Sequence, residues 1–126
     1  MPRRIVYLDG ATLNPGDIDW ECLIALGDFK VYDRTPEDKI LERVSGVPYV
    51  LTNKTPLSAA TIAQMPALEY IGVTATGYNV VDIAAAAERN IPVTNVPTYG
   101  TDSVAQHATA LMLEMARRVS VHERAV

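Results

Sequence analysis

The segment Thr74–Asn79 is the part of this sequence whose composition best suits the binding of a small anion. It follows a β-rich run, precedes an alanine-rich helical pattern and carries Gly77. A glycine before a helix allows successive backbone N–H groups to approach an anion at the positive helix end. Lys54, in the loop after an earlier β-rich run, offers a cation to the same ligand. The combination predicts a site for a small carboxylate, although short glycine turns also join strands to helices without binding anything.

Other residue types that commonly carry catalysis are isolated in this sequence. His107 lies within the last helical pattern and His122 near its end, and neither has an evident carboxylate partner to orient it as a base. Cys22 is the single cysteine and falls on an apolar helix face, which favours a small core residue over a nucleophile. No Cys/His cluster has the spacing of a zinc site, and no G-x-G-x-x-G occurs, so a complete dinucleotide site is not visible.

Five short β-rich runs alternate with helical patterns and must position these candidates. They cover residues 5–8, 29–32, 49–51, 70–73 and 93–96. The alternation predicts an α/β fold, because each helical crossover returns the chain to the same edge of a parallel sheet. We expect a flavodoxin-like, doubly wound five-stranded parallel sheet with helices on both faces. Ligands of such sheets bind beyond the carboxyl ends of the strands, which is where Lys54 and Gly77 lie.

Two of the helical patterns bear on this site. The alanine-rich helix after Gly77 is expected over residues 80–89. A long C-terminal helix is expected from Ser103 nearly to the chain end. Its apolar residues recur at steps of three and four, the spacing of one helix face. They are Val104, Ala108, Leu111, Met112, Met115 and Val119.

Length and composition exclude several classes of protein. The 126 residues suit one domain, and 48% hydrophobic with 21% charged residues is ordinary globular composition. The net charge of -4 comes from 15 acidic and 11 basic residues without a basic stripe, so nucleic acid is not an expected partner. No apolar run is long enough to span a membrane, and the first residues carry no signal-peptide core, so we expect a cytoplasmic protein that does not bind membranes.

Two other functions of flavodoxin-like domains fit the loops poorly. A phosphoacceptor domain needs an aspartate after the third strand, where this chain has Thr52, Asn53 and Lys54, and only Asp9 follows the first strand. A flavin mononucleotide site needs a hydroxyl-rich phosphate loop after the first strand, and residues 9–12 are a poor version of one. The fold by itself therefore does not decide the function.

Three stretches together resemble a known family. They are Leu51–Thr55, Ala75–Asp82 and Asn95–Ala105, in that order. They are similar to the NAD-dependent D-2-hydroxyacid dehydrogenases, and within these to the glycerate dehydrogenase or hydroxypyruvate reductase branch, which residues 7–16 also resemble. The similarity runs from end to end of the chain.

The resemblance implies an oxidoreductase with two domains, of which this chain holds one. Residues 1–102 would be the flavodoxin-like substrate-binding domain, and residues 103–126 a helix leading to a Rossmann NAD-binding domain that is absent from this chain. The family's catalytic arginine, glutamate and histidine and its G-x-G-x-x-G also lie in the absent portion, so no residue here inherits a catalytic role. The chain is therefore expected to look truncated, to be inactive alone and to bind no cofactor, whereas the full-length enzyme would use NAD or NADP.

The resemblance also assigns roles to particular residues. The substrate is implied to be a small 2-keto or 2-hydroxy acid, such as hydroxypyruvate and D-glycerate or glyoxylate and glycolate. Its binding residues would be Thr52, Asn53, Lys54, Thr76, Gly77, Tyr78 and Tyr99. Gly100 and Thr101 would lie beside the nicotinamide, at the hinge between the two domains. The C-terminal helix would contribute to a homodimer.

A function of a different class remains open from the sequence. The chain would then be a stand-alone flavodoxin-like module that binds a small anion through the Gly77 loop, or dimerises, without catalysis. No metal site is expected under either interpretation.

Overall fold

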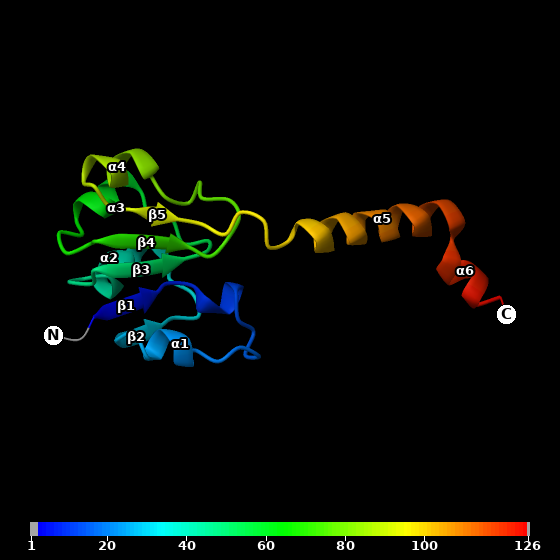
Figure 1. Ribbon diagram of the computed structural model, residues 1–126, viewed down its shortest axis with the longest axis horizontal. Coiled ribbons are helices and arrows are strands. Elements are labelled where there is room, and N and C mark those ends of the chain that lie inside the picture. The colour runs from blue at the N-terminus through cyan, green and yellow to red at the C-terminus, as the bar shows by residue number, and fades with distance from the viewer. Residues whose placement is uncertain (1–2, 126) are drawn as a thin grey trace.

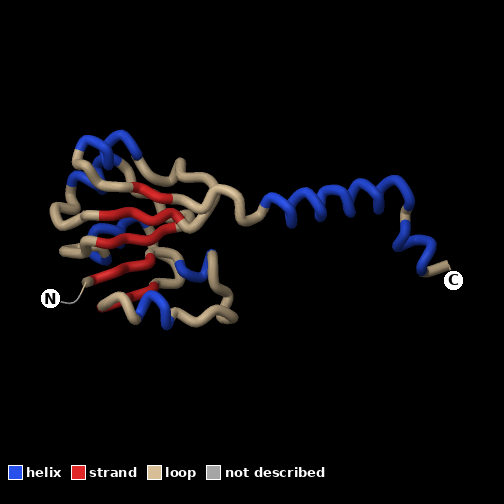
Figure 2. Tube along the Cα trace, viewed as in Figure 1, coloured by secondary structure: helices blue, strands red, loops and turns tan. Residues whose placement is uncertain are grey.

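The computed structural model describes residues 3–125, and the strands form an all-parallel sheet (Figures 1 and 2). The strands are β1 (Arg4–Tyr7), β2 (Asp28–Val31), β3 (Tyr49–Thr52), β4 (Tyr70–Val73) and β5 (Val93–Thr94). They lie in the order β2-β1-β3-β4-β5. This is the flavodoxin-like order, in which the winding reverses between β1 and β3. The predicted fold class is confirmed.

Short helices connect the strands. They are α1 (Glu21–Ile24), α2 (Ile40–Arg43), α3 (Ala59–Ala63) and α4 (Ile83–Glu88), with 3-10 turns η1 (Gly10–Thr12) and η2 (Glu37–Lys39). Side-chain caps fix where two of them begin: Ser58 Oγ accepts from Thr61 N at 3.2 Å, and Asp82 accepts from Ala85 N at 3.0 Å. Such caps satisfy N–H groups that the first turn leaves unpaired.

The main core lies between one face of the sheet and helices α2, α3 and α4. Alternate strand residues point into it, because successive side chains of a strand face opposite sides. Val6, Val50 and Ile71 supply the sheet side of this core. The helices supply Ile40, Val44, Ile62 and Ala86.

The other face of the sheet is covered near α1. Tyr7 is fully buried there, and its ring meets that of Trp20 edge to face at 5.6 Å between centroids. The Tyr7 hydroxyl shares a 2.5 Å hydrogen bond with Thr74 Oγ1, and burial raises the pKa of Tyr7. Farther along this face, a groove lined by Leu23, Leu51 and other apolar residues stays open. Helices therefore lie on both faces, but α1 covers its face only in part.

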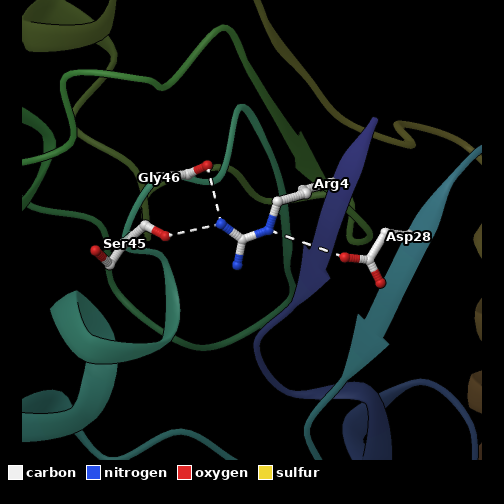
Figure 3. Close-up of polar contacts among 4 residues, drawn as sticks. All are labelled: Arg4, Asp28, Ser45 and Gly46. Carbon is white, nitrogen blue, oxygen red and sulfur yellow. Dashed lines mark hydrogen bonds and ion pairs between the residues drawn. The ribbon is translucent and has the colours of Figure 1, made fainter. Parts of the chain in front are cut away.

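Arg4 ties the amino ends of the strands to the α2–β3 turn (Figure 3). Its Nη1 donates to the carbonyl oxygens of Ser45 and Gly46, both at 3.3 Å, and its Nε lies 3.9 Å from the Asp28 carboxylate. Gly46 has a φ of 66°, a left-handed conformation that glycine adopts without strain. Because the Arg4 and Asp28 side chains are more than half exposed, their ion pair contributes little to stability.

The C-terminal helix differs from the sequence prediction. Helix α5 (Thr101–Arg117) begins two residues earlier than Ser103, and α6 (Val119–Glu123) follows it. Arg118 separates them with a φ of 50°, so the helix expected to run nearly to the chain end is broken. The sheet domain lies at one end of the molecule and α5 projects away from it (Figure 1), with none of its residues buried.

Cys22 also differs from its prediction. It lies in α1 but is exposed rather than in the core. Helix α1 is only four residues long and therefore makes a single turn. Leu23 lies on the side of this turn that faces the sheet, and Cys22 lies outside that side.

Candidate functional site

The loop between β4 and α4 presents consecutive backbone N–H groups to solvent. Within residues 3–125, the N–H groups of residues 76–79 meet no protein acceptor, and these four residues are exposed. The loop is nevertheless held on one flank. Asn95 Nδ2 donates to Thr76 O at 2.8 Å, and Val96 N donates to Ala75 O at 3.0 Å. The loop is thus held in place on one flank while its own amides stay unpaired within residues 3–125, and successive unpaired backbone N–H groups are the donors that anion sites use.

The helix after this loop begins later than the sequence predicted, which changes its expected part in anion binding. The helix expected from residue 80 begins at Ile83, and the Asp82 side chain already caps it. Residues 80–82 instead run beside Leu57, which donates to Val80 O at 2.8 Å and accepts from Asp82 N at 2.9 Å. Asp82 therefore already occupies a first-turn amide of α4, and the donors that the Gly77 loop itself offers are its own backbone amides.

The loop after β3 has the opposite property, because its amides are already occupied. Asp9, which is 2% exposed, accepts from three consecutive backbone N–H groups. Asn53 N lies 2.8 Å from Oδ1, Thr55 N lies 2.9 Å from Oδ2, and Lys54 N also donates to Oδ2. Hydrogen bonds to an ionised carboxylate are stronger than neutral ones. The aspartate therefore fills this loop's anion-binding amides from within the protein.

The side chains of the β3 loop have three different surroundings. Thr52 is fully buried, and its hydroxyl donates to Thr55 O at 2.8 Å, which closes the loop. Asn53 is 8% exposed, and its Nδ2 donates to Thr12 O at 3.5 Å. Lys54 is exposed and lines a cavity of about 460 Å³ together with Thr12 and residues 34–37.

The remaining candidates lie toward β5 and the start of α5. Tyr78 is half exposed and lines a separate groove with Ile83 and Asn95. Tyr99 is 72% exposed on the segment that leaves the sheet, and Gly100 and Thr101 open α5. The structure thus brings the β3 and β4 loops to one edge of the sheet, but it does not bring Lys54 and Tyr78 into one cavity.

Asp9 is the residue that sequence reasoning missed. The sequence singled it out only as a poor phosphoacceptor. Its position directly after β1 was the available signal, because β1 and β3 are neighbours in a 2-1-3-4-5 sheet and the residues that follow them must meet. The reversal of winding between β1 and β3 is also where such sheets bind their ligands.

The described residues contain no ready-made catalytic centre. No group of three or more His, Cys, Asp or Glu residues within 3–125 is placed to hold a metal ion. His107 is exposed and belongs to α5, the helix that projects from the sheet domain (Figure 1). In the same part of the chain, no helix has both the length and the hydropathy required to cross a membrane. The unpaired backbone N–H groups of residues 76–79 are therefore the candidate donors for a small anion in the described part of the chain.

Comparisons with known proteins match nearly the whole chain. Residues 11–124 match the family profile of the D-isomer specific 2-hydroxyacid dehydrogenase catalytic domain. The chain is 48% identical over 126 residues to a hydroxypyruvate reductase of Blautia hydrogenotrophica, and 34% identical over 128 residues to a glycerate dehydrogenase of Methylorubrum extorquens. These alignments cover 98% and 100% of this chain but only 39% and 40% of those proteins. The chain therefore spans about two fifths of the length of these relatives.

Solved structures show the same fold. An acyclic imino acid reductase in complex with NADPH and D-Arg matches with a TM-score of 0.79 at 25% identity, over 96% of this chain and 39% of that one. The NADPH-dependent glyoxylate/hydroxypyruvate reductase of Sinorhizobium meliloti, in complex with NADP and malonate, matches with a TM-score of 0.70 at 25% identity. That alignment covers 97% of this chain and 37% of the reductase.

Proposed function

Because this chain belongs to the D-isomer specific 2-hydroxyacid dehydrogenase family, we propose that it is the substrate-holding part of an oxidoreductase. The reaction is hydride transfer between NADH or NADPH and a small 2-keto acid, with hydroxypyruvate and glyoxylate as the candidate substrates. Relatives named for these two substrates support this choice.

The free amides of the β4–α4 loop are the observation that carries the proposal. Residues 76–79 are exposed and their N–H groups lack protein acceptors in the described chain, whereas Asp9 occupies the N–H groups of residues 53–55. The substrate carboxylate therefore binds at Thr76, Gly77 and Tyr78. Fixed donors at the carboxylate orient the adjacent carbonyl carbon, which lowers the entropic cost of reaction.

The nicotinamide cofactor is held mainly by other parts of the protein. A dinucleotide site needs a glycine-rich turn between a strand and a helix, and G-x-G-x-x-G does not occur in this sequence. Gly100 and Thr101, at the start of α5, are the residues proposed to approach the nicotinamide, and exposed Tyr99 lies beside them toward the substrate. The bound cofactor supplies the hydride. This chain positions the 2-keto acid, whose carbonyl carbon accepts it.

A comparison of two proteins tests this function. The 126-residue chain and the full-length protein encoded by its natural reading frame are assayed for loss of NADH and NADPH absorbance with hydroxypyruvate and glyoxylate. We expect turnover in the full-length protein only, because the acid–base residues and the dinucleotide site are missing from this chain. An absence of turnover in both, across a panel of 2-keto acids, would contradict the proposal and favour a non-catalytic anion-binding module.

Helix α5 is proposed to form a homodimer contact. Its apolar stripe is exposed throughout: Val104 is 69%, Met112 is 62% and Met115 is 81% exposed. Contiguous apolar surface of this kind marks an association site. We expect the 126-residue chain to sediment as a dimer and the double substitution Leu111→Glu with Met115→Glu to yield a monomer. Gln106→Glu, on the polar side of α5, is the control, and a wild-type chain that sediments as a monomer would refute the contact.

A further inference from the structure

Two consecutive peptide groups of the β4–α4 loop are held by their carbonyl oxygens. Val96 N donates to Ala75 O at 3.0 Å, and Asn95 Nδ2 donates to Thr76 O at 2.8 Å. Exchanging the amide nitrogen and oxygen of Asn95 would place two acceptors against each other, so this contact requires the nitrogen at Thr76 O. The loop is therefore fixed at the oxygen end of both peptide groups.

The nitrogen ends of the same two peptide groups are donors that we assign to the substrate carboxylate. The peptide bonds within residues 3–125 are trans, so the C=O and N–H of one peptide group point in opposite directions. The Ala75 carbonyl shares its planar group with Thr76 N–H, and the Thr76 carbonyl shares its group with Gly77 N–H. The bonds from residues 95 and 96 consequently direct both N–H groups away from that segment.

Asn95 is the side chain that takes part in this arrangement of carbonyl contacts. It directly follows β5 and is partly buried. A hydrogen bond to a carbonyl oxygen also polarises the peptide group, which strengthens its N–H as a donor to a further acceptor. The Asn95 contact therefore acts on both the direction and the strength of the Gly77 N–H.

We propose that Asn95 is a positioning residue for the substrate carboxylate, because its side-chain amide fixes and polarises the peptide group that carries the Gly77 N–H. This inference rests on the proposed function, since it assumes that the acid binds through the loop amides. Asn95 does not touch the substrate in this arrangement and acts through the Thr76–Gly77 peptide. Its contribution should therefore disappear when the Gly77 N–H is removed.

Steady-state kinetics of the full-length protein test this role. Asn95→Ala is expected to raise the KM for the 2-keto acid about three- to tenfold, the effect of one net hydrogen bond, and to leave the KM for the nicotinamide cofactor unchanged. Thr94→Val is the matched control. It removes a side-chain hydrogen bond of the neighbouring residue, between Thr94 Oγ1 and Tyr70 OH at 2.6 Å, and should keep both KM values of the wild type.

A double-mutant cycle separates positioning from general stability. Gly77→Pro removes the N–H through which Asn95 is proposed to act, so adding Asn95→Ala to it should change the KM for the 2-keto acid less than about twofold. A purely structural contribution of Asn95 would instead multiply the KM by the same factor in both backgrounds. Asn95→Leu, which is similar in size to asparagine but has no donor, is the second variant if Asn95→Ala does not fold.

A spectroscopic measurement on the 126-residue chain requires no turnover. The nitrogen chemical shift of a backbone amide depends on hydrogen bonding at the carbonyl oxygen of its own peptide group. Asn95→Ala should therefore move the Gly77 amide signal, whereas the signals of Ile71 and Val73 in β4 should stay at their wild-type positions.

The possible outcomes can be told apart. An unchanged KM for the 2-keto acid in active Asn95→Ala, or an equal rise in Thr94→Val, would overturn the inference and leave the proposed function standing. The same would follow from an unmoved Gly77 signal, or from a full effect of Asn95→Ala in the Gly77→Pro background. Wild-type protein that reduces no 2-keto acid with either cofactor would overturn the proposed function and this inference together.

Discussion

Asp9→Ala is expected to lower the free energy of unfolding of the 126-residue chain by about 3 to 5 kcal/mol. The substitution leaves the N–H groups of residues 53–55 without their acceptor inside the protein. A hydrogen bond to a charged group contributes about 1.5 to 3 kcal/mol, and water that enters the space left by the carboxylate recovers part of the total. Urea denaturation measures the loss as a shift of the midpoint.

Asp82→Ala is the matched control for this prediction. It also removes an aspartate that accepts from a backbone N–H, but the bond is single and lies at the start of α4. The loss of a helix cap costs about 1 kcal/mol. Equal losses of unfolding free energy in the two variants would show that Asp9 contributes no more than an ordinary helix cap. This result would contradict the interpretation that Asp9 stabilises the β3 loop by accepting from three of its amides.

Gly77→Pro is expected to raise the KM of the full-length protein for its 2-keto acid by about 10- to 100-fold. Proline removes the N–H that we assign to the substrate carboxylate, and a charged hydrogen bond of this kind is equivalent to such a factor. Gly77 does not have a positive φ, so its backbone does not exclude proline by handedness. Steady-state kinetics with varied 2-keto acid measures the change.

Gly77→Ala provides the control, because alanine keeps the N–H group. Its Cβ would lie 3.3 Å from Asn79 Oδ1, an exposed side chain that can move aside. The alanine variant should therefore remain much closer to wild type than the proline variant, with both melting near the wild-type temperature. Similar KM values for the two variants would show that the Gly77 amide does not bind the carboxylate.

Local signals predicted most of the fold. The alternation of β-rich runs with helical patterns predicted the five strands, although β5 covers only Val93–Thr94 of the expected residues 93–96. The signal was strongest for β1, β3 and β4, because these inner strands bury apolar side chains on a parallel sheet. Ser58 caps α3 through a purely local interaction, with its side chain accepting from Thr61 N. The helix after Gly77 began later than expected. Pairing of residues 80–82 with Leu57, a contact between distant parts of the chain, competes there with helix formation.

The candidate site, like the fold, was predicted in part from local sequence signals and in part depended on tertiary structure. The sequence by itself determined the Gly77 loop and the Asn53–Lys54 loop as candidates, because both follow β-rich runs and parallel strands end at one edge. Only the tertiary structure decided that Asp9 occupies one set of amides and that the other set meets no acceptor within residues 3–125. The physical reason is that a hydrogen bond between residues 44 positions apart depends on which strands are neighbours, and no local pattern of residue types records that order.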